Sequence, residues 1–319
     1  MSFGATEKLP GKKDVGSEPI THVILACDES GAKGYADRDE AFAGETGVFA
    51  GLMAPADFVD KVAPDFDAVA AQYATPDGKL HITDLPPPKQ AALRNEMFEL
   101  IRAHKVPCFY EAIHVAGFHR AHNNLSTLVA QARAAHTGPV KVSGGAIKPS
   151  SLHVALFQGL YGKVLAFCCE RDKTRLHIEV RTDRVDSPIV RNFEDVAHEL
   201  LEVGAKITKV TGFDTQTNKV VTGSVTTTAS GDYQLPVTVE HLEIKVVDDR
   251  DGLVVAADVL ANSLDYLFRT RNPAEKFRAL NWPKAFESHP LRDCLDSFGN
   301  WGGYNFTDTF YRHPNDPDL

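Results

Sequence analysis

The alternation of apolar and polar positions predicts a central β-strand close to the start of the chain. Residues 21–31 form an apolar run, rich in β-branched side chains, that ends in Asp28, Glu29, Ser30 and Gly31. Apolar side chains on both faces are typical of a strand that is buried on two sides. Gly31 permits a sharp turn, so the strand is expected to hold Asp28 rigidly at a sheet edge. The alternative is that the two acidic residues only open a turn.

The rest of the chain alternates between strand-like and helix-like periodicity. Apolar runs and alternating patterns predict further strands at 47–53, 79–84, 108–115, 176–183 and 238–247, and a hairpin or two edge strands at 206–228. Helical spacing predicts helices at 57–73, 89–104, 125–135, 152–170, 189–203 and from 252 onward. This order of elements predicts an α/β fold with a mixed central sheet and helices on both faces.

Two further acidic positions follow or interrupt apolar elements. The strand at 176–183 ends in Asp183, and Asp186 follows it closely. If the strands that end at Cys27 and Thr182 lie side by side and point the same way, Asp28 and Asp183 emerge at one edge of the sheet. We therefore predict this parallel pairing.

Asp258 is the only charged residue among the nine residues 253–261, which are otherwise apolar and are predicted to be helical. A lone carboxylate in such surroundings is unfavourable unless a cation, a hydrogen-bond donor or a proton compensates it. The partner is either a metal ion or, alternatively, a salt bridge or a hydrogen bond at the end of a helix.

Composition narrows the choice of function classes. The chain has 319 residues, 43% of them hydrophobic and 24% charged, which is ordinary for a globular protein of one or two domains. Its formal net charge of −9 argues against indiscriminate binding to nucleic acid. The five cysteines show no CxxC spacing, and no apolar run approaches the length of a membrane span. Residues 1–19 are polar, and we expect a flexible arm on a cytoplasmic protein.

These short motifs resemble the family called domain of unknown function 3800. The resemblance rests on Asp28-Glu29-Ser30-Gly31 at a strand end, on a strand containing His81, on Asp183 after another strand, and on 252–262 opening a late helix. It runs from about residue 21 to 268 and implies a ribonuclease H-like fold. The domain is then expected at 20–269, with a Thr/Val-rich β insertion near 206–239 and a C-terminal extension at 270–319.

The resemblance also implies a metal site. In related nucleases the positions filled here by Asp28, Asp183 and Asp258 hold divalent metal, so Mg2+ or Mn2+ is the expected cofactor. The family often has an acidic residue just before the histidine, where this chain has Lys79 and Leu80. A fourth carboxylate must then come from Glu29, Asp84 or Asp186, or be absent. His81 is expected to assist proton transfer, to position the substrate, or to be a structural histidine at a strand edge.

A phosphate-bearing substrate would require a basic surface on this acidic protein. The segment 269–292 contains six basic residues against two acidic ones, and four of them are candidate nucleic-acid contacts: Arg269, Arg271, Lys276 and Arg278. The alternatives are that this segment is only a solvated helical tail, and that the stretch between Arg133 and Lys148 provides the contact surface. Runs of charged residues are usually solvent-exposed surface without a binding role, and this alternative applies to both stretches.

The expected function is hydrolysis of phosphodiester bonds in RNA or DNA with a divalent metal. The alternative is a catalytically silent module of the same fold that recognises a nucleic acid or a protein. A zinc site is less favoured, because cysteines or carboxylates do not frame the histidines at 104, 114, 119, 122 and 136. A serine nucleophile at Ser30 is not supported either, because the chain lacks a GxSxG motif around it.

Overall fold

Five strands form one mixed sheet in the order β3-β2-β1-β5-β8, with β1 at its centre. They are β1 (Thr21–Gly31), β2 (Thr46–Pro55), β3 (Cys108–His114), β5 (Arg175–Thr182) and β8 (Thr238–Val246). β1 pairs antiparallel with β2 and parallel with β5, and β8 continues the parallel half. The α/β class and the mixed sheet are therefore confirmed. The parallel pairing of the strands that end at Cys27 and Thr182 is confirmed too.

The structure is a computed structural model. It describes residues 19–75, 80–135, 138–143, 148–183, 187–201, 205–228, 236–247, 250–295 and 306–318. Almost all of the predicted N-terminal arm, and the candidate ligand Asp186, lie outside these ranges.

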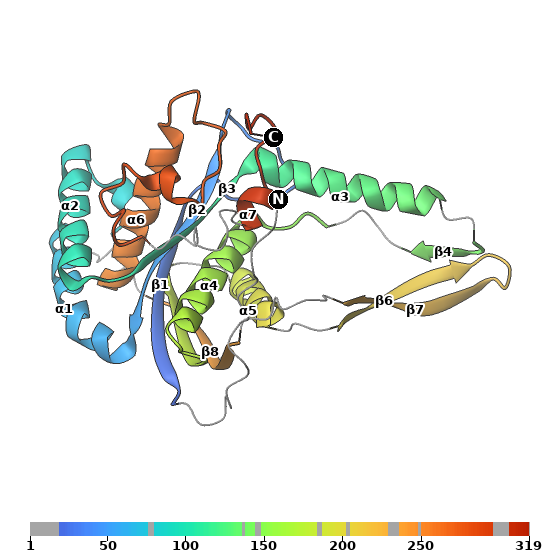
Figure 1. Ribbon diagram of the computed structural model, residues 1–319, viewed down its shortest axis with the longest axis horizontal. Helices are drawn as coiled ribbons and strands as arrows, with labels where there is room; N and C mark the ends of the chain where they lie inside the picture. Colours follow the sequence, from blue (N-terminus) through green and yellow to red (C-terminus); the bar gives the residue numbers. More distant parts are fainter. Residues whose placement is uncertain are drawn as a thin grey trace, which may run out of the picture.

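Helices cover both faces of the sheet (Figure 1). On one face lie α1 (Ala56–Tyr73), α2 (Pro87–His104) and α6 (Gly252–Arg269), and on the other lie α4 (Leu152–Glu170) and α5 (Ser187–Leu201). β1 is buried from both sides, because Ile24 and Ala26 face the α6 layer whereas Leu25 and Cys27 face the α4 layer. This is the two-sided burial that the continuous apolar run predicted.

A smaller sheet projects from the main body beside the long helix α3 (Val115–Ala135) (Figure 1). It contains β4 (Val140–Ser143), β6 (Ala205–Asp214) and β7 (Lys219–Thr228) in the order β4-β6-β7. β6 and β7 form an antiparallel hairpin, which decides between the two predictions for 206–228. The helix predicted at 125–135 begins ten residues earlier, because the buried turn at Val115 to Phe118 continues directly from β3.

The residues after α6 fold back onto the same body. They include the short helices η3 (Pro283–Phe286) and α7 (Phe306–Phe310), and Leu280, Phe286 and Leu291 are buried in the hydrophobic cluster that also contains α6. The Asn281 side chain bonds both backbone groups of Ala112, at 2.8 and 2.7 Å. It thereby caps the outer edge of β3. The described part of 270–319 is thus packed into the domain, and is not a solvated tail.

One predicted strand is absent. Residues 80–84 approach α6 in an extended conformation and then form a short 3₁₀ helix, η2 (Ile82–Asp84), directly before the prolines that open α2. Alternating apolar positions imitate a strand here, but the backbone N–H of Ile82 bonds to a side chain on α6 instead of to a neighbouring strand. The expectation that His81 lies on a strand is therefore wrong.

Candidate active site

Asp28 lies where the parallel half of the sheet ends. The pairing of β1 with β5 runs to Cys27 and Thr182, so Asp28 is the first residue of β1 beyond it, and Asp183 is the first residue after β5. β1 itself continues to Gly31, with Asp28 opposite Ala50 of β2. The alternative that Asp28 opens a turn is therefore wrong. Gly31, the last residue of β1, has a φ of +81°, a backbone conformation that favours glycine.

Asp258 projects from the buried face of α6. Its carboxylate contacts hydrogen-bond donors from residues 80–84. Its Oδ2 accepts the backbone N–H of Ile82 at 3.0 Å and lies 3.1 Å from Nδ1 of His81. The Asp258 side chain is only 8% exposed, whereas that of His81 is 49% exposed. This arrangement supplies the partner that a carboxylate in an apolar helix requires.

The carboxylates of Asp28 and Asp258 interact electrostatically. Burial raises the pKa of Asp28 well above its usual range, and the negative charges of Asp258 and Glu29 raise it further. The hydrogen bond to Asp258 raises the pKa of His81 to about 9, with smaller contributions from Asp183 and Asp84. Asp28, Asp183, Asp258 and His81 therefore belong to one electrostatic neighbourhood.

Glu29 points to a different set of partners. It forms an ion pair with Lys33, four residues on, and its Oε2 lies 3.4 Å from Nε2 of His153 at the start of α4. Burial disfavours the Glu29 carboxylate, but His153 and Lys33 outweigh burial and lower the pKa of Glu29 to about 2. Glu29 is therefore a compensated anion beside the site, and its ionisation is secured without a metal ion.

Sequence reasoning did not single out Lys33 or His153. The charges of Glu29, Asp28 and Asp258 together favour the protonated form of Lys33 and raise its pKa against the effect of burial. The signal for His153 was weak but present, because it is a titratable residue in the first turn of a helix that is otherwise nearly apolar. Lys33 therefore brings compensating positive charge to the acidic end of β1, and His153 lies within 3.4 Å of the Glu29 carboxylate.

The donor set suits a hard divalent cation. Asp28 and Asp258 offer only carboxylate oxygens, both side chains are buried, and the ionised form of Asp28 is disfavoured by its surroundings. Oδ1 of Asp258 is not used by Ile82 or His81. Carboxylate oxygens are the ligands that Mg2+ and Mn2+ prefer, and such a cation would offset the repulsion. Asp28, Asp183 and Asp258 thus fit the metal that the resemblance implies.

The closest grouping of potential metal ligands lies elsewhere. In the described ranges, three potential ligand atoms within 4.8 Å of one another occur at His177, His241 and Glu243. The convergence of Asp28, Asp183 and Asp258 to metal-bridging distances stays a prediction, and Asp186 is outside the described residues.

The four basic residues proposed as nucleic-acid contacts occupy different environments. Arg269 pairs with Asp265 and Arg278 pairs with Glu275 and Asp318. The guanidinium of Arg271 donates to the backbone carbonyls of Arg278, Ala279 and Ala285 at 3.0–3.4 Å. Burial lowers the pKa of Arg271. Arg271 thus holds the C-terminal segment together. Lys276 is the member of the four for which the described residues provide neither an ion pair nor a side-chain hydrogen bond.

The histidines considered for zinc are dispersed. His104 bonds to Asp65, His114 lies 3.1 Å from the carbonyl of Arg278, and His119 lies 2.9 Å from the carbonyl of Ala36. Each of these rings has its own local partner, and His136 lies outside the described residues. The five cysteines are free thiols.

No family model matches the chain, and no curated protein matches it with significance. The resemblance to the family called domain of unknown function 3800 therefore stays a prediction. Among the described helices, α4 alone has the length and apolar composition to cross a membrane, but 67% of its apolar window is buried inside the protein. This is weak support for a membrane role, because the buried core helix of a folded domain has the same composition.

Proposed function

We propose that the chain is a divalent-metal-dependent nuclease of ribonuclease H-like architecture, with its active site at Asp28, Asp183 and Asp258. The observation that carries the proposal is a pair of buried carboxylates that repel each other, Asp28 at the end of the parallel part of β1 and Asp258 on α6. The mixed sheet with helices on both faces is the architecture that the resemblance implies. A cytoplasmic location belongs to the same proposal.

A bound Mg2+ or Mn2+ would supply Lewis acidity at the phosphodiester and activate the attacking water. Asp28 and Asp258 would hold the cation, with Asp183 from the neighbouring strand end. Because binding requires ionised ligands and the pKa of Asp28 is raised, metal affinity should increase with pH.

His81 is placed to handle a proton on the solvent side. Its Nδ1 contacts the Asp258 carboxylate, so Nε2 is the ring nitrogen that could contact a substrate. The ring is half-exposed. With a pKa of about 9, His81 is protonated at neutral pH. It can therefore donate a hydrogen bond to a phosphate oxygen, or act as a general acid that gives a proton to the leaving oxygen. Lys33 keeps positive charge beside the same carboxylates.

Cleavage of short single-stranded and double-stranded RNA and DNA in the presence of Mn2+ tests the proposal. Asp28→Asn and Asp258→Asn should lose manganese-dependent cleavage while remaining folded by circular dichroism. Asp265→Asn is the matched control, because Asp265 is a second buried carboxylate on α6 that pairs with Arg269. It should cleave as wild type does.

Calorimetric titration with MnCl2 separates metal binding from catalysis. Wild type should bind Mn2+ and Asp258→Asn should bind it more weakly. If wild type binds no Mn2+ at millimolar concentration, or if both aspartate variants cleave normally, the nuclease proposal fails. Binding of nucleic acid without any cleavage would then favour the silent recognition module.

A further inference from the structure

The face of β5 and β8 that lies toward the α6 layer carries only polar side chains over much of its length. Among the described elements, α6 packs on β1 and β2 and does not pack extensively on β5 or β8. Alternate residues of the two strands project here: His177, Glu179 and Arg181 from β5, and His241, Glu243 and Lys245 from β8. A sheet face without a hydrophobic cover is free to serve a purpose other than core packing.

Three histidines form a row across this face. The strand register places His22 of β1 opposite His177, and His177 opposite His241. The His22 and His177 rings stack with centroids 4.2 Å apart and an interplanar angle of 9°. The His177 and His241 rings meet at 81° with centroids 4.6 Å apart. The row therefore depends on three segments that are far apart in the chain.

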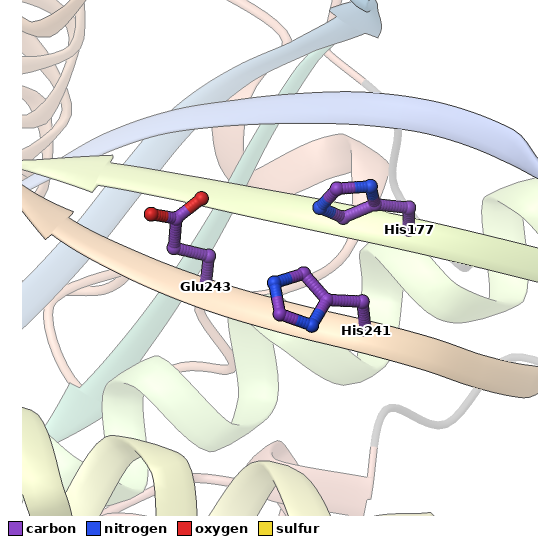
Figure 2. Close-up of side chains that lie close together, drawn as sticks. All are labelled: His177, His241 and Glu243. Carbon is purple, nitrogen blue, oxygen red and sulfur yellow. The ribbon is translucent and has the colours of Figure 1, made fainter.

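Glu243 completes the group from the same strand as His241. The two residues are two positions apart on β8, so both side chains project from one face. Potential ligand atoms of His177, His241 and Glu243 all lie within 4.8 Å of one another (Figure 2). Glu243 also contacts Lys245 at 3.2 Å, and its side chain is 43% exposed. It has room to turn toward the two rings.

Two ring nitrogens in this row are not satisfied by hydrogen bonds among the described residues. Nε2 of His22 and Nε2 of His177 are buried and have no hydrogen-bond partner among the described residues. A buried ring nitrogen without a partner is unfavourable, because it has lost its bond to water. Coordination to a metal ion is one of the few interactions that satisfies a neutral imidazole nitrogen in such a place.

We propose that His177, His241 and Glu243 form a second metal site, which takes a borderline transition-metal ion of the Zn2+ class, with His22 packed beside it. Two imidazoles and one carboxylate suit Zn2+, Ni2+ or Cu2+ better than Mg2+. Metal–ligand bonds of about 2 Å require the three side chains to draw closer together. Glu243 can do so by leaving Lys245, and the open sheet face leaves a coordination position for water or another ligand.

This site is independent of the acidic one. His22 precedes Asp28 by six residues on β1, which corresponds to roughly 20 Å along an extended strand. Both residues project from the same face, but at opposite ends of it. The site at His177 and His241 offers mainly nitrogen ligands, whereas the site at Asp28 offers oxygen ligands. The two sites would therefore select different metals.

A calorimetric titration of the full-length protein with ZnCl2 tests the proposal. Asp28→Asn is used as the background, with 1 mM MgCl2 present, so that binding at the acidic site does not contribute. We expect one equivalent of Zn2+ to bind. His241→Ala should weaken binding by more than about tenfold, and Glu243→Gln should weaken it without a change in fold. His198→Ala, which removes an exposed histidine from α5, should bind as the background does.

Substitution of Co2+ for Zn2+ gives an independent readout. The absorption bands of Co2+ should report nitrogen ligation and should disappear in the His241→Ala variant. Binding should also fall below about pH 6, because protonated imidazole cannot coordinate. The proposal is overturned if no saturable Zn2+ binding occurs below about 100 µM. It is equally overturned if His241→Ala and Glu243→Gln bind Zn2+ like the background protein. Neither result would bear on cleavage at the acidic site.

Discussion

Asp28 carries a carboxyl group that its surroundings disfavour in the ionised form. Its pKa is raised by burial and then by Asp258 and Glu29. The folded protein therefore holds the Asp28 proton more tightly than the unfolded chain does, and ionisation of Asp28 above its ordinary pKa destabilises the fold. The role proposed for Asp28 as a metal ligand predicts such a cost to stability, because the bound cation would offset the negative charge that destabilises the fold without it.

Replacing Asp28 with Asn should therefore raise the free energy of unfolding at neutral pH. Below the ordinary pKa of an aspartate both states of wild type are protonated, so the gain should vanish there and grow as the pH rises. Urea denaturation of wild type and Asp28→Asn at pH 3.5 and pH 7, without divalent ions, measures this difference. A variant that is less stable than wild type at pH 7 would show that Asp28 has a compensating partner.

His81 makes the opposite contribution. Its folded pKa of about 9 lies above the ordinary value of 6.5, because Asp258 accepts a hydrogen bond from the ring. The stabilisation is fully present below pH 6.5 and is lost as the pH rises through about 9. His81→Gln should thus lower the thermal midpoint most at pH 6 and very little at pH 10. His198→Gln provides a control at an exposed histidine, and an equal deficit at both pH values would exclude the ion pair as the cause.

At the scale of elements, the position of Asp258 depends on how closely α6 approaches α1. The backbone N–H of Gly252 donates to Asp67 at 2.8 Å, and Asp251 caps the following two residues. A Cβ at position 252 would lie 2.3 Å from the backbone carbon of Phe66. Only glycine permits this contact, so the first turn of α6 sets the depth at which Asp258 enters the site.

Gly252→Ala should therefore destabilise the protein by about 1–3 kcal/mol or more, as in other overpacked cores. Gly162→Ala is a matched control in the middle of α4, where the nearest atom to a new Cβ is 3.8 Å away. It should stabilise the protein by about 0.5–1 kcal/mol, because alanine loses less backbone entropy than glycine. Chemical denaturation of both variants distinguishes the two effects. A harmless Gly252→Ala would mean that α6 can shift away from α1.

The whole molecule is acidic, so contact with nucleic acid depends on where its cations are accessible. Arg271 is bonded to three backbone carbonyls, whereas Lys276 has neither an ion pair nor a side-chain hydrogen bond within the described residues, so the two cations are expected to play different roles. Arg271→Ala should lower the thermal midpoint. Arg269→Ala combined with Lys276→Ala should weaken binding of an oligonucleotide and leave the fold intact.

Fluorescence anisotropy at several salt concentrations measures this binding. The logarithm of the affinity should depend less steeply on the logarithm of salt concentration, by roughly 0.7–0.9 for each lost phosphate contact. An unchanged slope would remove these two residues from the interface and would direct attention to Arg133, Lys141 and Lys148 around β4. Lys284→Ala serves as the control, because Lys284 lies over the Trp282 ring on the same C-terminal segment.

Local patterns in the sequence determined the class of fold and several elements almost to the residue. The helix predicted at 152–170 is α4, and the apolar run at 21–31 is β1. Both predictions succeeded because periodicity and two-sided burial are properties of a single segment. The segment at 79–84 failed as a strand because its alternating pattern does not specify a neighbouring strand, and its partner lies on α6.

Tertiary structure decided which side chains meet. The bond between Ile82 and Asp258 spans 176 positions in the chain, and the row of His22, His177 and His241 depends on the order and register of three strands. Sequence alone indicated that Asp28 and Asp258 each required compensation, because a carboxylate among apolar residues is unfavourable wherever it lies. It could not identify His81 and the backbone of Ile82 as the partners of Asp258, or Lys33 and His153 as the partners of Glu29. Contacts between distant segments follow from how the layers pack, and no local pattern records that packing.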